Sequence, residues 1–377
     1  MSHNILLVTH VTPDSIYGAG SSLRQHMELM ADQEVSILLP VHRKIKSPAN
    51  GLRVFKFFCP ITYNNDERHG FVRRIILSGG SRLAFWLSSP LVFFRLMRIK
   101  PDVVHLNSLV LSDFLLLLGL YKVFRKVAVV SHVREMLSFE MSAYQKWLVS
   151  VCDHLVFIDH AVEKRFHEVV GAPKASDVVQ NPFSGASADY KLPTSLQFLK
   201  SESRIVYAIA GRIEDGKGVL EICQEFARSQ LRNSLLVIVG GGSEPYVQKI
   251  KEAESDSNGC VRYVGQIDNL QASGFFSEID FLVRGEPFFC TGRTVYEALY
   301  SGASVVLPGS ERNLEMDTVL ADFKEYVEFY EPRDFSRMIE LVRENEDRNM
   351  KGSSRISHCN YEDYSKAIAS IYSKVVE

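Results

Sequence analysis

The chain has 377 residues, and this length predicts two or three domains rather than one small module. Its 46% hydrophobic and 23% charged residues are typical of a globular protein and exclude a disordered or collagen-like chain. The 43 Lys and Arg residues against 45 Asp and Glu give a formal net charge of −2, which argues against the overall basic field of a nucleic-acid-binding protein.

Short aliphatic runs alternate with longer helix-like stretches in both halves of the chain. In the first half the predicted strands are 4–8, 35–39, 103–106, 127–131 and 155–158. In the second half they are 205–209, 235–239, 261–264, 281–283 and 304–307. This alternation is the signature of parallel α/β sheets, so we predict two Rossmann-like, doubly wound domains.

Composition also predicts where these domains begin and end. Residues 182–203 are rich in Ser, Pro, Ala and Gly and lack clear periodicity, which predicts a linker (184–203) between an N-terminal domain (1–183) and a C-terminal domain (204–359). Residues 360–377 have apolar side chains at helical spacing, which predicts a closing helix. Its apolar residues are Tyr364, Ile368, Ile371, Tyr372 and Val375.

Cysteine spacing and the apolar runs predict a cytoplasmic location. The six cysteines lie far apart, without the C-x-x-C pairs or Cys/His spacings of a zinc site, so we expect free thiols in a reducing compartment. The N-terminus lacks the basic and apolar regions of a signal peptide. The longest apolar run, 114–120, is shorter than the roughly 18 residues that a membrane span needs, and it indicates a core helix.

Positive charge gathers in residues 41–100, which contain twelve Lys and Arg against two acids. Large apolar residues lie between these charges: Phe85, Trp86, Leu87, Phe93, Phe94, Leu96 and Met97. This mixture is typical of amphipathic helices that lie on anionic membrane surfaces, but it equally fits a core helix with a solvated basic face. Both interpretations stay open at this point.

Open parallel sheets bind ligands beyond the carboxyl ends of their strands, so the loops that leave the strands are of most interest. The first such loop holds Gly18-Ala19-Gly20 before a predicted helix, whose N-terminus favours an anion. The loop 240–244, which includes Gly241, would let the backbone lie flat against a nucleoside. Each of these glycine-rich segments also fits an ordinary turn.

The loop 211–218 adds two cations to a glycine-rich turn. Arg212 suits a diphosphate because its guanidinium binds oxygens in pairs, and Lys217 supplies a mobile point charge. The loop nearly satisfies the G-x-x-x-x-G-K-[ST] pattern of phosphate-binding NTPases. However, Gly218 lacks the hydroxyl that would hold magnesium, and acids stand where phosphates belong, so the NTPase interpretation is disfavoured. A purely structural turn is the remaining alternative.

The loop 285–292 leads into a helix predicted from Gly292 to Gly302, whose N-terminus offers a second phosphate site. Helical side chains lean toward the N-terminus, so Glu297 is expected to reach back over the first turn and accept hydrogen bonds from sugar hydroxyls. The alternative is an exposed Arg293–Glu297 ion pair of small energy. The two interpretations fit this segment equally well.

The second half of the chain contains, in this order, the motifs Gly211-Arg212, Lys217-Gly218, Val239-Gly240-Gly241-Gly242, Val264-Gly265, Glu286-Pro287-Phe288 and Gly292-Arg293-Thr294-Val295-Tyr296-Glu297-Ala298. The first half contains Gly18-Ala19-Gly20, Asp102-Val103-Val104-His105, Ser131-His132-Val133-Arg134-Glu135 and Val179-Gln180-Asn181-Pro182. Together these motifs resemble the retaining glycosyltransferases of family four over nearly the whole chain. The resemblance implies a GT-B architecture: two Rossmann-like domains that face a central cleft, with the C-terminal helix crossing back to the first domain.

The resemblance also implies a role for each matching residue. On the donor side, Arg212 and Lys217 would hold the diphosphate, Glu297 the ribose, and Gly241 and Ile267 would lie near the nucleoside. Other donor contacts would come from Gly18, Gly20, Thr291, Gly292, Arg293 and Thr294. The acceptor side would include His105, Asn107, His132 and Arg134, although Asn107 stands where many relatives carry a histidine. The residues expected to act in catalysis are Glu286, His132, Arg212 and Lys217.

One carboxylate departs from the family pattern. The family's first motif Glu, which binds the transferred sugar, precedes the second by eight positions, but position 289 here is Phe. The nearest candidate, Glu286, lies eleven residues before Glu297. We interpret Phe289-Cys290-Thr291 as a three-residue insertion that leaves Glu286 available in a longer loop. The alternative is that the carboxylate has been lost.

The sequence therefore predicts transfer of a hexose-type sugar, with retention at the anomeric carbon, from a UDP-, GDP- or dTDP-linked donor to a hydroxyl acceptor. The expected acceptor is a lipid-linked or cell-envelope glycan intermediate, as in lipopolysaccharide or O-antigen biosynthesis, reached from the cytoplasm or as a peripheral protein on the inner face of the cell membrane. The chain has no D-x-D pair of aspartates, so no metal or other cofactor is expected. The alternatives are a sugar-nucleotide epimerase of the same fold and a non-catalytic nucleotide-sugar-binding subunit of a polysaccharide assembly system.

Overall fold

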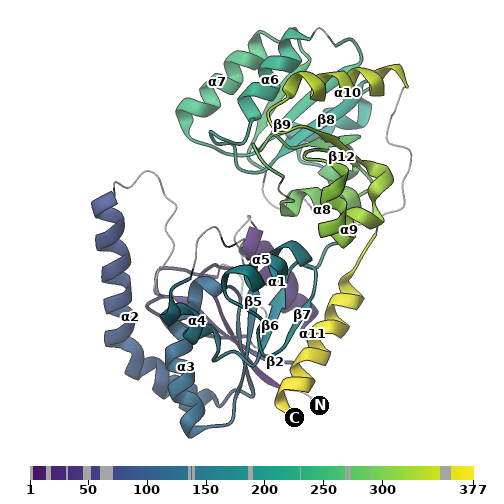
Figure 1. Cartoon of the computed structure of the whole chain (residues 1–377). Coiled ribbons are helices and arrows are strands. Elements are labelled where there is room, and N and C mark those ends of the chain that lie inside the picture. The colour runs from purple at the N-terminus through teal and green to yellow at the C-terminus, as the bar shows by residue number, and fades with distance from the viewer. Residues whose placement is uncertain are drawn as a thin grey trace. The chain divides into compact units, whose positions relative to one another are not determined.

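The computed structural model describes residues 3–13, 18–30, 33–45, 52–59, 71–134, 137, 141–185, 190–229, 231–267, 270, 273–289, 291–348 and 358–377. The chain divides into two compact units. Residues 1–182 together with 361–377 form unit 1, and residues 183–360 form unit 2. Each unit contains one β-sheet with helices packed against it (Figure 1).

Unit 1 is built on a seven-stranded parallel sheet with the strand order β3-β2-β1-β4-β5-β6-β7. Its strands are β1 (Asn4–Val8), β2 (Glu34–Pro40), β3 (Arg53–Phe57), β4 (Val103–Leu106), β5 (Ala128–Val133), β6 (His154–Phe157) and β7 (Ser176–Val178). The direction of winding reverses between β1 and β4. In sheets of this kind, ligands bind beyond the carboxyl ends of the strands at the reversal.

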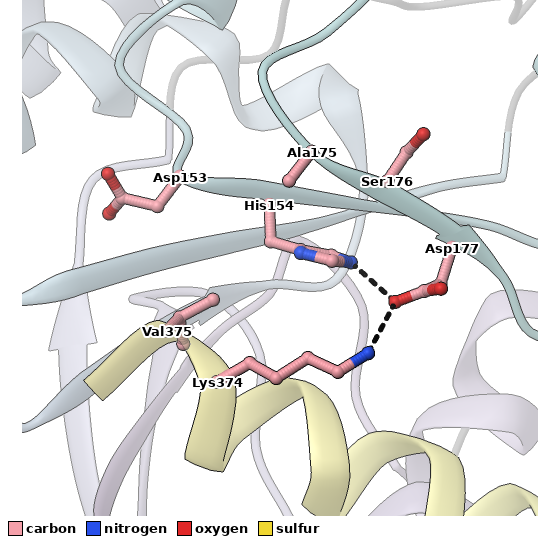
Figure 2. Close-up of a pocket in the computed structure, with 7 residues that line it drawn as sticks. All are labelled: Asp153, His154, Ala175, Ser176, Asp177, Lys374 and Val375. Atoms are coloured by element: carbon pink, nitrogen blue, oxygen red, sulfur yellow. Dashed lines mark ion pairs between the residues drawn. The ribbon is translucent and has the colours of Figure 1, made fainter. Parts of the chain in front are cut away.

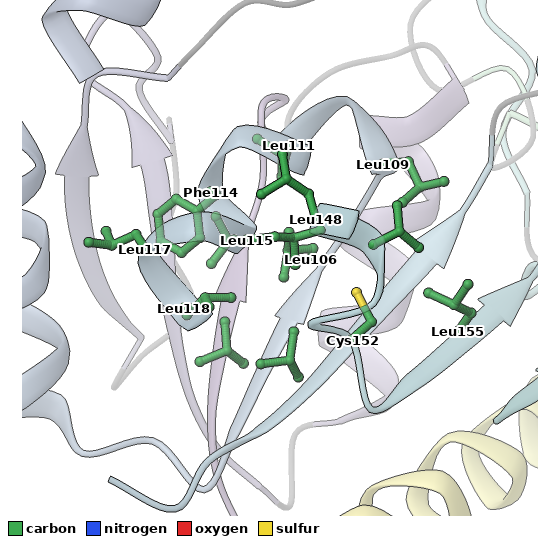
Figure 3. Packing of buried hydrophobic residues seen from close by; sticks show 14 of the residues in the cluster. Leu106, Leu109, Leu111, Phe114, Leu115, Leu117, Leu118, Leu148, Cys152 and Leu155 are labelled. Carbon is green, nitrogen blue, oxygen red and sulfur yellow. The ribbon is translucent and has the colours of Figure 1, made fainter. Parts of the chain in front are cut away.

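Helices cover both faces of this sheet. They are α1 (Gly18–Leu29), α2 (Phe71–Ile99), α3 (Ser112–Phe124), α4 (Ala143–Val149), α5 (His160–Val169) and α11 (Tyr361–Val376), and the 3-10 helix η1 (Leu109–Leu111) precedes α3. Helices α2 to α5 pack with one set of alternating strand residues, such as Leu106, and α1 and α11 pack with the other set, such as Val130. Figure 3 shows Phe114 of α3 and Leu148 of α4 above the strand residues of the first face.

Unit 2 contains a six-stranded parallel sheet with the order β10-β9-β8-β11-β12-β13, whose winding reverses between β8 and β11. The strands are β8 (Ile205–Ala210), β9 (Ser234–Val239), β10 (Val261–Gly265), β11 (Phe281–Val283), β12 (Ser304–Pro308) and β13 (Val327–Tyr330). The helices are α6 (Val219–Arg228), α7 (Glu244–Ser255), α8 (Arg293–Tyr300), α9 (Thr318–Asp322) and α10 (Phe335–Asp347), with 3-10 turns η3 (Phe275–Ser277), η4 (Glu311–Met316) and η5 (Lys324–Tyr326).

The predicted two-domain α/β fold is confirmed, and the ten predicted strands are present to within one or two residues at each end. Three strands were not predicted: β3, β7 and β13. All three lie at the edges of their sheets, and their residues are mostly half-exposed and mixed in polarity. A strand without a fully buried face lacks the aliphatic run on which the prediction relied.

The segment expected to be a linker contains regular structure. Within residues 190–203, Thr194–Ser201 form the 3-10 helix η2, and its Leu196 and Leu199 are buried in the core of unit 2. A 3-10 helix places residues i and i+3 on the same face, which is the spacing of these two leucines. At the other end of the chain, α11 belongs to unit 1, where it buries Tyr364, Ile368, Ile371 and Tyr372.

The apolar run 114–120 lies within α3, which is largely buried as a core helix. Within the described ranges, no helix combines the length and the hydropathy that spanning a bilayer demands. None of the five described cysteines is joined to another, and Cys290 lies outside the described residues.

Candidate active site

Glycines bring three loops of unit 2 into backbone contact at the carboxyl ends of β8, β9 and β11. Gly218 has a left-handed φ of +66°. It lies so close to the loop after β11 that a Cβ atom at this position would stand 2.2 Å from the Gly285 carbonyl oxygen. A Cβ on Gly240 would stand 1.7 Å from the Gly211 carbonyl oxygen. These glycines therefore allow the loops to pack against one another, a role that the sequence analysis had not assigned to them.

The two predicted diphosphate ligands stand on the first of these loops. Arg212 Nη1 lies 3.6 Å from Glu214 Oε2, and Lys217 Nζ lies 3.4 Å from Glu214 Oε1. The side chains are 62% and 32% exposed for Arg212 and Lys217. Ion pairs between exposed groups contribute little to stability, so Glu214 can give way to a stronger anion at small cost.

A buried ion pair holds Glu286 beside the start of α8. Arg284 Nε donates to Glu286 Oε2 at 3.0 Å, and Arg284 Nη2 pairs with the other carboxylate oxygen; the two side chains are only 12% and 8% exposed. Arg284 Nη1 donates to Thr294 Oγ1 at 2.9 Å, and Tyr330 donates to the Arg284 carbonyl oxygen at 2.5 Å. One arginine thus ties the Glu286 carboxylate to the first turn of α8.

Arg284 was not among the predicted site residues. The signal that could have identified it is its position, because it directly follows β11 at the carboxyl end of the sheet. Gly292 caps α8 in an extended conformation, and a Cβ at this position would stand 3.0 Å from Arg284 Nη1. Glycine at position 292 therefore leaves room for the guanidinium.

The Arg293–Glu297 ion pair exists, but it is buried rather than exposed. Arg293 Nε donates to Glu297 Oε1 at 2.7 Å, and the two side chains are only 11% and 8% exposed. The guanidinium also lies 4.7 Å from the centre of the Phe183 ring. The alternative of a weak surface pair is therefore wrong for this segment.

The remaining predicted donor contacts of the second half of the chain lie on the same edge of the unit 2 sheet. Tyr296 donates to Asp317 Oδ2 at 2.6 Å, and its hydroxyl lies 3.0 Å from Thr291 Oγ1 just before α8. A Cβ on Gly241, in the loop after β9, would stand 2.6 Å from Gln266 Oε1, and Ile267 follows Gln266 after β10. The two positions expected near the nucleoside therefore come from neighbouring loops.

In unit 1, the predicted acceptor residues Asn107 and Arg134 form a hydrogen-bonded group at the carboxyl ends of β4 and β5. Arg134 Nε donates to the Asn107 carbonyl oxygen at 3.0 Å, and Arg134 Nη2 donates to Asn107 Oδ1 at 3.2 Å. Arg134 Nη1 also donates to Asn181 Oδ1. The buried Asn107 Nδ2 has no hydrogen-bond partner among the described residues. Gly18 and Gly20 begin α1, after β1.

His105 and His132 belong to a buried cluster beneath α1 and α11. His105 Nε2 lies 2.6 Å from His132 Nδ1, and His105 Nδ1 lies 2.5 Å from the Tyr372 hydroxyl. His26 of α1 completes the cluster, with Nδ1 2.7 Å from Tyr364 and Nε2 3.2 Å from Tyr372. The sequence analysis missed His26 and both tyrosines.

Burial sets the protonation state of these histidines. Desolvation lowers the pKa of His26 to about 3 and the pKa values of His105 and His132 well below their usual range, with nearby Arg134 acting in the same direction. All three rings are therefore neutral at pH 7. His132 Nε2 is buried and has no partner among the residues that the structure describes, whereas both nitrogens of His105 are engaged.

A pocket of about 480 Å³ lies at the opposite end of the unit 1 sheet, where β6 and β7 begin. Figure 2 shows His154 and Lys374 on either side of Asp177. His154 Nε2 is 3.0 Å from Asp177 Oδ2, and Lys374 Nζ of α11 is 3.8 Å from the same oxygen. Since it opens at the amino ends of the strands, we assign this pocket to the packing of α11 rather than to the active site.

No family model matches the chain, and no curated protein sequence matches it. Several solved structures are similar to it along nearly their whole length. The Anabaena protein HepE in complex with UDP has a TM-score of 0.64 at 14% identity, covering 100% of this chain and 97% of the other. Sucrose-phosphate synthase from Thermosynechococcus elongatus has a TM-score of 0.68 at 13% identity, covering 98% of both chains. The lipopolysaccharide outer core galactosyltransferase WaaB has a TM-score of 0.59 at 13% identity, covering 99% of this chain and 96% of the other.

This likeness extends over both units and establishes that the chain has the GT-B glycosyltransferase fold. The expected two-sheet architecture is thereby confirmed. Roles of individual residues do not follow from the fold. They rest on the contacts of this chain.

Proposed function

We propose that the chain is a retaining glycosyltransferase, which moves a hexose-type sugar from a nucleotide diphosphate to a hydroxyl of an acceptor. The observation that carries the proposal is the convergence of Arg212, Lys217 and the start of α8 at one sheet edge, beside two buried carboxylates. HepE, which shares the fold, has been crystallised with UDP and with UDP-glucose. This supports a nucleotide-sugar donor here.

The diphosphate would bind where Glu214 now neutralises Arg212 and Lys217. A leaving diphosphate gains negative charge as the sugar–phosphate bond breaks, and two cations together with the positive end of α8 would stabilise that charge more in the transition state than in the bound donor. We propose that they take the part that a divalent metal plays in other glycosyltransferases.

We assign the contact with the transferred sugar to Glu286. The loop before α8 is longer than the family pattern, but Arg284 bonds both Glu286 and Thr294 and so holds the carboxylate at the first turn of the helix. This contact supports the insertion interpretation over loss of the carboxylate. Glu297, held by Arg293, is assigned to the ribose hydroxyls.

We assign the acceptor site to unit 1. We propose that neutral His132 offers Nε2 to a hydroxyl of the sugar, while His105 and the tyrosines of α11 fix the orientation of its ring. Asn107, which Arg134 holds through two hydrogen bonds, presents its Nδ2 as a donor to the acceptor. The incoming hydroxyl would attack on the face from which the diphosphate leaves, and a diphosphate oxygen would take its proton. In this proposal the acceptor is a lipid-linked or cell-envelope glycan intermediate, presented at the inner face of the cell membrane.

The proposal is tested by following nucleotide diphosphate release from UDP-, GDP-, ADP- and dTDP-sugars, with and without a lipid-linked glycan extract as acceptor. We expect release from one donor only when acceptor is added, with formation of a glycosylated product. Conversion of the donor sugar without acceptor would instead identify an epimerase. Donor binding without any release would identify a non-catalytic subunit, and either result would overturn the proposal.

A further inference from the structure

Helix α2 has an exposed apolar stripe on the face opposite the core. The described part of α2 presents Leu83, Leu87, Leu91 and Phe94 at a helical spacing, and these residues are 53% to 75% exposed. On the other side of the same helix, Phe85, Val92 and Leu96 are buried in the core of unit 1. A surface helix needs only one apolar face to pack on its domain, so the second face requires another explanation.

The C-terminal half of α3 extends this stripe into a wider surface. Leu120, Val123 and Phe124 are 53% to 77% exposed. The rings of Phe124 and Phe93 are 5.7 Å apart between centroids, which places this end of α3 directly beside α2. In Figure 1, α2 stands at the outer edge of unit 1 with α3 next to it. We call the seven residues the apolar surface: Leu83, Leu87, Leu91, Phe94, Leu120, Val123 and Phe124.

The charges near the apolar surface are mostly positive, although the exposed Asp102 follows α2. Residues 71–101 contain no Asp or Glu. The exposed cations Arg98 and Lys100 lie at the end of α2, and Arg125 follows Phe124. The one acid of α3, Asp113, pairs with Arg82 at 2.9 Å and is almost fully buried. The surface therefore combines large apolar side chains with a cationic border that is not neutralised by acids of the two helices.

We propose that the apolar surface docks the protein on an anionic lipid bilayer, with its leucine and phenylalanine side chains at the acyl boundary and the cations among the headgroups. A lipid surface supplies both the apolar phase and the negative charge that this arrangement lacks. A second copy of the chain fits less well, because the same face of that copy would cover the apolar side chains but bring no acid of α2 to pair with Arg98 and Lys100.

This inference extends the proposed membrane-presented acceptor to a named surface, and it corrects the residues expected from sequence. Phe85 and Leu96, which lie in the basic stretch, are core residues, and Phe93 is partly buried against α3. Three of the seven exposed residues belong to α3, outside residues 41–100 altogether. Exposure, rather than composition, therefore defines the surface.

The test measures co-sedimentation of the full chain with phosphatidylcholine vesicles, with and without phosphatidylglycerol. We expect binding to the anionic vesicles, a fall on raising salt to about 0.5 M because charges are screened, and little binding to neutral vesicles. The Leu87→Ser/Phe94→Ser variant should bind about tenfold or more weakly, since two apolar anchors are lost. The Arg98→Gln variant should bind the anionic vesicles more weakly than the wild type does, and its binding to neutral vesicles should not change.

Phe288→Ser is the matched control, because Phe288 is 60% exposed and Phe94 is 65% exposed, but Phe288 lies in unit 2. We expect Phe288→Ser to bind vesicles like the wild type and Phe94→Ser alone to bind them more weakly. Unchanged melting temperatures would show that both variants fold. Equal binding to neutral and anionic vesicles would overturn the proposal. The proposal would also be overturned if the wild type formed a dimer that does not bind vesicles and that the Leu87→Ser/Phe94→Ser substitutions dissociate. No glycosyl transfer is measured, so the outcome is independent of the proposed reaction.

Discussion

At the scale of single residues, the most informative side chain is Arg284. It contacts both oxygens of Glu286 and the hydroxyl of Thr294, and all three residues flank the loop that departs from the family pattern. If Glu286 binds the transferred sugar, Arg284 is a positioning residue that acts through the carboxylate. Its removal would leave a buried carboxylate unpaired, which is costly in itself.

We therefore predict different defects for two substitutions in this pair. Glu286→Gln keeps the shape of the side chain but weakens its bonds to sugar hydroxyls, so discrimination between donor sugars should fall while the affinity for the free nucleotide diphosphate stays the same. Arg284→Gln should likewise reduce discrimination between donor sugars, and in addition it should lower the melting temperature because it leaves the buried Glu286 carboxylate unpaired. Steady-state kinetics with a panel of donor sugars provides the measurement. Unchanged donor kinetics in Glu286→Gln would place this carboxylate outside the site.

A second prediction at this scale concerns the buried histidine cluster. The unfolded chain binds protons at its histidines below about pH 6.5, whereas the folded His26, with a pKa of about 3, does not. Unfolding therefore takes up protons, and the free energy of unfolding should fall as the pH is lowered from 6.5 toward 4, by about 1.4 kcal/mol per pH unit for each such histidine.

Urea unfolding at a series of pH values checks this prediction. His26→Gln should flatten the pH dependence by removing one of the histidines that the fold keeps neutral. His167→Gln, at an exposed position of α5, is the control for loss of a histidine outside the cluster. Equal stability of the wild type at pH 7 and pH 5 would argue against a neutral cluster.

At the scale of elements, we expect the contacts between the glycine-rich loops to determine whether the proposed site can form. Gly216 and Gly218 both have left-handed φ values, +82° and +66°, but only Gly218 lies against another loop. Replacement by alanine should cost roughly 1–2 kcal/mol at either position because of the backbone conformation. Only Gly218→Ala should also displace the loop 285–292, because its Cβ would stand 2.2 Å from the Gly285 carbonyl oxygen.

The pair of variants therefore separates strain from loop contact. We expect Gly216→Ala to be mildly destabilised and to bind nucleotide normally, whereas Gly218→Ala should be less stable still and should lose most nucleotide binding. Denaturant unfolding and nucleotide titration of the two variants are the measurements. Identical behaviour of the two proteins would show that contact between the loops does not support the site.

At the scale of the whole molecule, the buried strands were predictable from sequence because they are continuous aliphatic runs, and the closing helix because its apolar residues recur at helical spacing. The edge strands β3, β7 and β13 were not, since half-exposed strands carry mixed side chains. Within the proposed site, Arg212 and Lys217 were predicted from loop composition. The partners His26 and Tyr372 could not be predicted, because they come from other segments and only the fold brings them to the predicted residues.

The central claim is that unit 2 holds a nucleotide diphosphate through Arg212 and Lys217. The most direct test is calorimetric titration with UDP, GDP, ADP and dTDP of the wild type, of Arg212→Ala/Lys217→Ala, and of Arg228→Ala/Lys249→Ala, which removes the same charge from α6 and α7. We predict that one diphosphate binds the wild type and the control equally. The Arg212→Ala/Lys217→Ala protein should bind it at least about tenfold more weakly, because charge-assisted bonds to phosphate are lost. Equal affinity in all three proteins, or no nucleotide binding by the wild type, would contradict the account.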